Sequence, residues 1–294
     1  MPAILVIGAT GTVGHQLVSQ LINASISVRA LLRNPDSANL PAEVERVRGD
    51  LSAPETLDAP LKRIDAVFLV WTAPPGTVPS VINRIAKSVP RLVFLTAPHR
   101  TPHPFFQQPN PLSAMLSGIE SYIESTHLEW TFVRPGMFAS NCIDWWGSAF
   151  RNNEIVRWPL LQAPTAPIDP RDVAAVAALA LTDSQKSHAA KNYVITGPES
   201  LTQLEQLQII ADTIGRPLRC EDLSPDESRR VLVPPFPLPV INMLIDAWTA
   251  ALGQPAHVTT TVAELLNRPA HTFRDWVEHN ASAFLPQPGH SDPH

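Results

Sequence analysis

The chain has 294 residues, of which 44% are hydrophobic and 17% charged, and a formal net charge of −5 at pH 7. This composition is typical of a soluble globular protein with one large α/β domain, or with a core domain and a smaller lobe. The basic residues are scattered, whereas a nucleic-acid backbone needs a clustered basic face, so we expect no nucleic-acid partner. No apolar run approaches the ~20 residues of a membrane helix, so we expect no membrane association.

The amino-terminal sequence MPAILVIGATG has no basic segment before its apolar run, so it predicts a first β-strand and not a signal peptide. The two cysteines, Cys142 and Cys220, are too few for a disulfide framework and are typical of small core residues. Together these features predict a cytoplasmic protein.

The first half of the sequence alternates short apolar runs with amphipathic stretches. The apolar runs predict strands at residues 3–7, 27–32, 44–48, 66–70, 91–95 and 129–133. The amphipathic stretches predict helices at residues 12–24, 54–61, 78–88 and 112–126. Because such strands need cover on both faces, the pattern predicts an α/β fold with a doubly wound parallel sheet, the Rossmann plan.

After residue 134 this alternation ends. A helix is predicted at 170–181, where Asp169 serves as its cap and a proline follows, and a short strand at 192–196. Further helices are predicted at 201–214, 225–233, 239–252 and 273–284. We therefore expect a Rossmann core over residues 1–135, a smaller, mostly helical substrate lobe over 136–285, and a disordered polar tail over 286–294.

The sequence GATGTVG, residues 8–14, stands between the first predicted strand and the first predicted helix. Gly8 permits a tight turn, Gly11 lets a pyrophosphate approach the backbone, and Gly14 lets the helix pack against the sheet. The phosphates then meet the free N–H groups and the dipole of the helix amino terminus. This order of strand, turn and helix predicts binding of a dinucleotide.

The end of the second strand indicates which dinucleotide. An NAD site places an acidic residue there to bind the ribose 2′-hydroxyl, whereas this chain has Arg33, which suits the 2′-phosphate of NADP(H). The alternative is that Arg33 is only a solvated charge, and Asp36 nearby weakens the assignment. After the third strand, Asp50 either accepts a hydrogen bond from the adenine amino group or is a plain turn residue.

Five segments together carry a family resemblance: GATGTVG, VRALLRNP, RGDL, DAVFLV and LEWTFVRPGMFASN. The chain resembles the NmrA-like, or atypical, branch of the short-chain dehydrogenase/reductase superfamily. The resemblance implies a Rossmann core, a carboxy-terminal substrate lobe and NADP(H). It does not imply one activity, because members include quinone, imine and phenylpropanoid reductases and also regulators that sense the cofactor without turnover.

The resemblance also implies cofactor contacts along the chain. Arg33 looks like the 2′-phosphate contact, and Asp50 with Leu51 the adenine contacts. The loop at residues 134–138 resembles the loop beside the nicotinamide. The implied contacts are Gly8, Thr10, Gly11, Thr12, Val13 and Gly14 at the phosphates, Arg33, Asp50 and Leu51 at the adenosine, Trp71, Thr72 and Ala73 at the ribose, and Thr96, Pro135, Gly136, Met137 and Phe138 near the nicotinamide.

The departure from the family is catalytic. Extended reductases of the superfamily carry Tyr-x-x-x-Lys on the helix after the fifth strand, with an acidic residue four positions later. If Glu120 is that acidic residue, the two positions hold Leu112 and Leu116. No shift restores the pair, because Tyr122 and Tyr193 are not followed by a lysine four residues later. Ordinary ketone reduction therefore lacks its acid.

Four residues are candidates for substrate contact or proton donation: Thr96 at a strand end, His99 and His103 in a proline-rich loop, and Tyr122. Each has a plainer interpretation, as a strand-end hydroxyl, an exposed loop histidine or a core tyrosine. The His99 and His103 spacing does not predict a metal site, because Pro102 prevents a helix and no third ligand is evident.

Aromatic residues predict either a pocket over the nicotinamide or an ordinary core; they are Phe105, Phe106, Phe138, Trp145, Trp146, Trp158 and Trp248. A pocket favours a small apolar or aromatic substrate. The sequence thus favours an NADP(H)-dependent reductase of a quinone, enone or iminium compound. The alternatives are an NADP(H)-sensing regulatory protein with a protein partner and no turnover, and a non-redox isomerase or cyclase.

Overall fold

The computed structural model describes residues 3–232 and 236–286. Its central sheet contains seven parallel strands. Its order is β3-β2-β1-β4-β5-β6-β9. The strands are β1 (Ala3–Ile7), β2 (Ser27–Leu32), β3 (Glu45–Arg48), β4 (Ala66–Val70), β5 (Arg91–Leu95), β6 (Glu129–Pro135) and β9 (Lys191–Ile195). The order reverses between β1 and β4, which is where open α/β sheets bind ligands at the carboxyl ends of their strands. The predicted doubly wound fold is confirmed.

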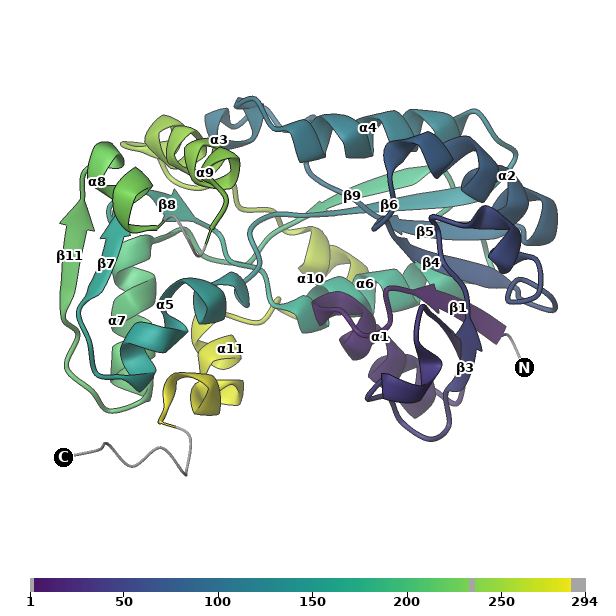
Figure 1. Ribbon diagram of the computed structural model, residues 1–294, viewed down its shortest axis with the longest axis horizontal. Helices are drawn as coiled ribbons and strands as arrows, with labels where there is room; N and C mark the ends of the chain where they lie inside the picture. Colours follow the sequence, from purple (N-terminus) through teal and green to yellow (C-terminus); the bar gives the residue numbers. More distant parts are fainter. Residues whose placement is uncertain (1–2, 233–235, 287–294) are drawn as a thin grey trace.

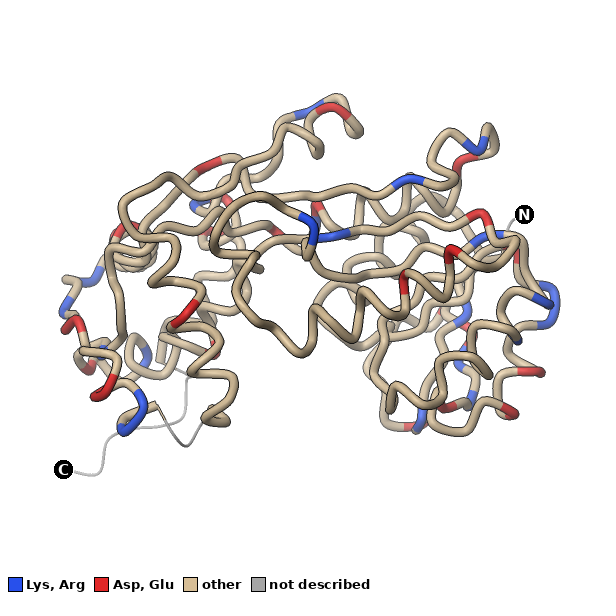
Figure 2. Tube along the Cα trace, turned by 90° about the horizontal axis from the view of Figure 1, so that it is seen from above, with Lys and Arg blue, Asp and Glu red and all other residues tan. Residues whose placement is uncertain are grey.

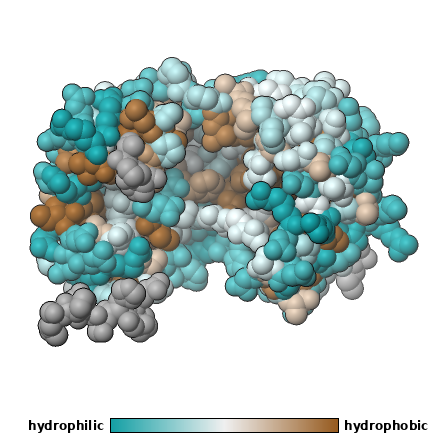
Figure 3. Space-filling model, viewed as in Figure 1, coloured by the Kyte–Doolittle hydropathy of each residue, from teal (hydrophilic) through white to brown (hydrophobic). Residues whose placement is uncertain are grey.

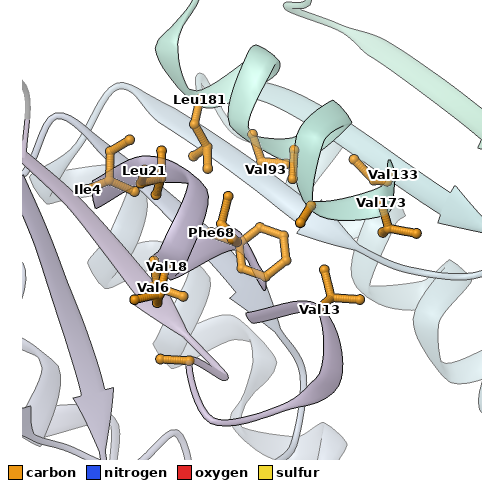
Figure 4. Close-up of a cluster of buried hydrophobic side chains, with 14 of the residues drawn as sticks. Ile4, Val6, Val13, Val18, Leu21, Phe68, Val93, Val133, Val173 and Leu181 are labelled. Atoms are coloured by element: carbon orange, nitrogen blue, oxygen red, sulfur yellow. The ribbon is translucent and has the colours of Figure 1, made fainter. Parts of the chain in front are cut away.

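Helices cover both faces of this sheet (Figure 1). One layer contains α1 (Thr12–Asn23), α6 (Pro170–Thr182) and α10 (Thr261–Leu266), and the other contains α2 (Val78–Ser88) and α4 (Pro111–Glu124). Successive side chains of β1 point to opposite faces of the sheet, so Ile4 packs in the first layer and Leu5 in the second. Figure 4 shows Phe68 of β4 in the first layer, among side chains from α1 and α6.

A second body of structure holds its own core beside the sheet (Figure 1). Its elements are α3 (Pro104–Gln107), α5 (Asn141–Arg151), β7 (Val156–Pro159), β8 (Pro164–Thr165), β10 (Leu201–Thr202), α7 (Gln203–Thr213), β11 (Cys220–Leu223), α8 (Pro225–Val231), α9 (Leu238–Ala251) and α11 (Phe273–His279). The strands β7 and β11 pair in parallel, and β8 pairs with β10 in antiparallel fashion. We call this body the lobe.

After residue 135 the chain passes between the lobe and the sheet more than once. The chain leaves the sheet after β6, but α6 and β9 return to it, and α10 packs against α6. The lobe is therefore interrupted, because the strand β9 and two of the three helices of one layer, α6 and α10, come from the carboxy-terminal half. The predicted tail over residues 286–294 lies, beyond residue 286, outside the described residues.

Several predicted elements differ in kind or length. The helix expected at 54–61 is a 3₁₀ turn, η2 (Pro54–Leu57), and the helix expected at 273–284 is divided at Asn280 into α11 and η4 (Ala281–Phe284). The sequence patterns missed α3, α10 and the strands of the lobe, whose short lengths give no clear period. They also missed α5, although it is as long as α2. Two further 3₁₀ turns are η1 (Pro35–Ser37) and η3 (Pro75–Thr77).

The surface carries interspersed charges, with Lys and Arg alternating with Asp and Glu over the trace (Figure 2). Within residues 3–232 and 236–286, no helix has both the length and the apolar character to cross a bilayer. The same residues contain no group of three His, Cys, Asp or Glu side chains placed to hold a metal ion.

Candidate active site

A groove of about 400 Å³ lies at the carboxyl ends of the central strands. Its walls come from the glycine turn after β1, the ends of β2, β4 and β5, and the loop after β6. The lining residues are Ile7, Gly8, Ala9, Thr10, Gly11, Thr12, Val13, Gly14, Leu31, Leu32, Arg33, Gly49, Asp50, Leu51, Val70, Thr72, Leu95, Phe138, Ser140 and Asn141. This is the switch-point crevice in which the sequence predicts a dinucleotide.

The three glycines of the turn are needed for different structural reasons. Gly8 has a φ of +94°, and a Cβ on Gly14 would stand 2.0 Å from the Gly8 carbonyl oxygen, so the chain itself requires both. Gly11 has an ordinary φ of −81°, and its nearest contact to an added Cβ is 3.4 Å. The space at Gly11 is therefore left to the groove. No side chain caps α1 and its first turn has no acidic residue, which fits an anionic pyrophosphate.

Arg33 lies exposed on the part of the groove that is formed by the end of β2. It shares a shallow surface hollow with Thr10, His15, Asn34 and Ser37, and within the described part of the chain it forms no ion pair, with Asp36 or any other acid. The sequence did not single out His15 or Ser37. Asp50 lines the groove, and its Oδ1 accepts the Ser52 N–H at 2.8 Å, so it also serves as a turn residue.

Some expected cofactor contacts lie elsewhere. Trp71 is buried in the core, where its Nε1 donates to the Ala73 carbonyl at 2.6 Å, and of residues 71–73 only Thr72 lines the groove. Thr96 and residues 135–137 line a neighbouring cavity instead. For Trp71 the reason is the strand register, which turns its side chain into the layer formed with α2 and α4.

That neighbouring cavity, which we call the substrate cavity, measures about 250 Å³. It is lined by Thr96, Ala97, Pro98, Phe105, Phe106, Gln108, Asn110, Leu112, Ser113, Leu116, Pro135, Gly136, Met137, Phe138, Asn141, Met243, Leu244 and Ala247. Two residues, Phe138 and Asn141, line both this cavity and the cofactor groove. Apolar residues stand along the recess between the two halves of the molecule (Figure 3).

The helix α4 presents Leu112 and Leu116 to the substrate cavity. These are the positions at which the family resemblance places tyrosine and lysine. The catalytic pair is thus replaced by apolar side chains on the cavity wall itself. The helix α9 adds Met243, Leu244 and Ala247, which no sequence motif indicated because α9 is apolar over most of its surface.

Thr96 is the one catalytic candidate of the sequence that the structure places on the wall of the substrate cavity. Its hydroxyl is buried and has no hydrogen-bond partner among the described residues, while its N–H donates to the Val133 carbonyl at 2.9 Å. A buried hydroxyl without a partner is costly, so this group is available to a ligand.

His99 instead belongs to a buried network beneath the cavity. Glu120, which is fully buried, accepts hydrogen bonds from Arg134 Nε at 3.0 Å and Nη2 at 2.5 Å, and Arg134 Nη1 donates to Asn192 Oδ1 at 3.1 Å. His99 Nδ1 donates to the Ala97 carbonyl, and Nε2 lies 3.2 Å from Glu120 Oε2 without hydrogen-bond geometry. Burial lowers the pKa of His99 against the opposing effect of Glu120.

Two further candidates, His103 and Tyr122, do not line the substrate cavity. His103 caps α3: Nδ1 accepts the Phe105 N–H and Nε2 donates to the Pro255 carbonyl, so both ring nitrogens are engaged. Tyr122 faces α2, where its hydroxyl donates to Asn83 Oδ1 at 3.2 Å. Helical periodicity explains this, since Tyr122 lies six residues from Leu116 and so on a different side of α4.

The tryptophans form the core of the lobe and not the pocket. Trp146, Trp158 and Trp248 are each at most 1% exposed and pack against one another, and Trp145 is stacked on Trp158. Of the expected aromatic wall, Phe105, Phe106 and Phe138 line the cavity. The plainer interpretation of the tryptophans is therefore the correct one.

Known NAD(P)H-binding proteins are similar to this chain over most of its length. A family model described as NAD(P)H-binding matches residues 8–184, more than half of the chain. A reductase of (4-alkanoyl-5-oxo-2,5-dihydrofuran-3-yl)methyl phosphate from Streptomyces griseus is 36% identical, over 97% of this chain and all of the relative. An NAD(P)H azoreductase from Xenophilus azovorans is 32% identical, over 96% of this chain and 99% of the relative. The chain therefore belongs to the NAD(P)H-binding family that this model describes.

Solved structures agree with this NmrA-like fold. The NADPH-dependent quinone oxidoreductase of Escherichia coli superposes with a TM-score of 0.78 at 21% identity, covering 94% of this chain and 99% of that chain. An NmrA structure superposes with a TM-score of 0.73 at 14% identity, covering 97% and 96%. At these identities the likeness shows the fold alone. The chain therefore has an NAD(P)H-binding domain with an apolar cavity beside it.

Proposed function

We propose that this protein is an NADP(H)-dependent reductase of a small, apolar, conjugated acceptor such as a quinone, an enone or an iminium ion. The observation that carries the proposal is the shared wall: Phe138 and Asn141 line both the dinucleotide groove and the substrate cavity. The groove residues would hold a dinucleotide with its pyrophosphate at Gly11, and Phe138 and Asn141 would contact its nicotinamide end at the junction. A bound nicotinamide would supply hydride at that junction.

The cavity wall supports an acceptor that needs no strong acid. Leu112 and Leu116 replace the phenol and ammonium that ketone reduction uses. The apolar side chains would hold a flat substrate by its faces. After hydride addition an iminium is neutral, while a quinone or an enone spreads negative charge onto an oxygen that water can protonate. The product proton therefore comes from solvent.

The relatives support a conjugated acceptor. The substrate named for the Streptomyces griseus relative contains an alkene conjugated with two carbonyl groups, and the substrate class named for the Xenophilus azovorans relative is the azo group. Both named groups are conjugated π-systems, which is the kind of acceptor proposed for this protein. For the cofactor, the exposed Arg33 beside the groove supports NADP(H) over NAD(H).

The test is oxidation of NADPH and of NADH, followed by absorbance, against a panel of quinones, activated alkenes, azo compounds and cationic dyes, with direct binding measured by fluorescence. We expect NADPH to bind more tightly than NADH and to be oxidised by at least one class. Tight binding with no oxidation across the panel would overturn the reductase proposal.

A second function is favoured by one observation, the loss of the Tyr and Lys positions to Leu112 and Leu116 on the cavity wall. A regulatory protein whose binding to a protein partner depends on bound NADP(H) carries out no reaction, so it needs no proton donor in the cavity. Tight NADPH binding without oxidation in the same panel is the result expected of such a regulator.

A further inference from the structure

The helix α9 carries an apolar stripe out of the substrate cavity. Its residues Met243, Leu244 and Ala247 line the cavity. Val240 lies one turn earlier on the same side of the helix, three and four residues before Met243 and Leu244, and is 38% exposed. We call these four residues the α9 stripe. At a rise of about 1.5 Å per residue, the stripe extends about 10 Å from the cavity wall to the surface.

The other sides of α9 have different surroundings. Ile241, Ile245 and Trp248 are at most 3% exposed and pack in the core of the lobe. Asp246, the charged residue of the helix, is exposed and lies about 120° around the helix from Val240, at about 100° per residue. Val240 therefore belongs neither to the core nor to the charged side, and the stripe stays apolar as it leaves the cavity.

The substrate cavity is small for a ligand with a long chain. It measures about 250 Å³, whereas pockets that enclose drug-sized ligands measure roughly 300–1,000 Å³. Its wall also reaches the surface on α4, where Leu112 is 57% exposed. A flat ring would occupy the cavity itself, next to Phe138, and a chain attached to that ring would leave water by lying along the α9 stripe.

We propose that the acceptor carries an alkyl chain that lies along the α9 stripe from Ala247 to Val240. The inference rests on the proposed reductase function; it narrows the substrate class to alkyl-substituted conjugated acceptors and assigns Val240 as a residue that determines specificity. Each methylene that leaves water improves binding by up to about fourfold. A protein partner fits the stripe less well, because a stable interface covers about 800 Å² on each partner, far more than one turn of helix offers.

The contact with the chain is remote from the reacting atoms, so it should lower KM and leave kcat unchanged. Ethyl- and octyl-1,4-benzoquinone share one reacting ring and differ only in the chain. For the parent protein we expect kcat/KM to be at least about 10-fold higher with the octyl compound, with kcat within about twofold. Equal kcat/KM values for the two quinones would overturn the inference.

Three variants locate the chain on the protein: Val240→Asp, Val240→Leu and the control Leu238→Asp. Leu238 is 45% exposed in the same first turn of α9, but it lies about 160° around the helix from Val240. Val240→Asp should reduce the octyl-to-ethyl ratio of kcat/KM to below about threefold, while Val240→Leu and Leu238→Asp keep it within about twofold of the parent value. The ethyl quinone should react alike in all four proteins. An equal reduction of the ratio in both aspartate variants would contradict the assignment.

A binding measurement separates this inference from the reductase proposal. Ethylphenol and octylphenol are titrated by calorimetry into the complex of the protein with NADP⁺, which requires no turnover. We expect octylphenol to bind at least about tenfold more tightly than ethylphenol, and Val240→Asp to remove most of this difference while circular dichroism stays unchanged. If no acceptor oxidises NADPH but this difference is found, the reductase proposal falls and the chain site stands. Equal affinities for the two phenols, or a dimer that Val240→Asp dissociates without changing phenol binding, would contradict the chain site.

Discussion

Arg134 donates two hydrogen bonds to Glu120 in the interior of the protein, and so joins the end of β6 to α4. The pair lies beneath the substrate cavity, because β6 leads to the loop of residues 135–138 and α4 carries Leu112 and Leu116. A buried carboxylate with this bidentate partner fixes two walls of one cavity relative to each other.

Replacement of Glu120 with glutamine is expected to destabilise the protein strongly. Arg134 is 2% exposed, so it would keep a buried charge without a counterion, at a cost of about 3–5 kcal/mol in the free energy of unfolding. Chemical denaturation measures this, and Glu124→Gln on the exposed side of the same helix is the control. A loss no larger than that of the control would show that the pair does not stabilise the fold.

The stability of the protein should fall as the pH is lowered below about 6.5, the ordinary pKa of histidine. Burial lowers the pKa of His99, and that of His257, in the folded state. The unfolded chain therefore binds more protons in this window, and acid favours unfolding. His99→Gln should reduce the loss of melting temperature between pH 7 and pH 5.5, while His15→Gln, at an exposed histidine, should not. The same dependence of melting temperature on pH in all three proteins would contradict the role given to the lowered pKa of His99.

Two glycine substitutions should separate ligand binding from folding. Gly11→Ala meets no backbone obstacle and has an allowed φ, so stability should stay the same or rise by up to about 1 kcal/mol. Its methyl group occupies the space left for the pyrophosphate, so NADPH affinity should fall about 10- to 100-fold. Gly14→Ala places its Cβ 2.0 Å from the Gly8 oxygen and should cost about 3 kcal/mol or more in stability. Calorimetry and fluorescence titration measure the two effects, and full NADPH affinity in Gly11→Ala would exclude the proposed phosphate site.

Arg33→Gln should change the preference between the two cofactors. Loss of a charge-assisted hydrogen bond to the 2′-phosphate costs about 1.5–3 kcal/mol, so NADPH should bind about 10- to 100-fold more weakly. NADH lacks that phosphate, and its Kd should stay within about twofold. Arg48→Gln removes an exposed positive charge at the same end of the sheet but not on the groove, so it tests for general electrostatics. An equal weakening of NADH and NADPH would argue against a specific contact.

Much of the nucleotide-binding half was predictable because its signals are local. The glycine turn, the apolar strands and the helix that follows are each fixed by neighbours in sequence, and β1, β2, β4, β5 and α2 match the predicted ranges. In the lobe the helices α7, α8 and α9 were predicted close to their observed ranges, but its strands were not, because they are too short to carry a distinct period. The return of α6 and β9 to the sheet depends on contacts between distant segments, which no local pattern records.

The sequence by itself determined the doubly wound fold, the dinucleotide turn and the loss of the tyrosine and lysine pair, because each of these rests on residue type at a fixed spacing. Only the tertiary structure decided which polar groups meet the substrate cavity. Four candidates were equivalent in sequence, yet burial and register place His99 in an ion-pair network, turn His103 and Tyr122 to other partners, and leave the Thr96 hydroxyl open. The same packing brings Asn141, a residue without a predicted role, to the junction of groove and cavity.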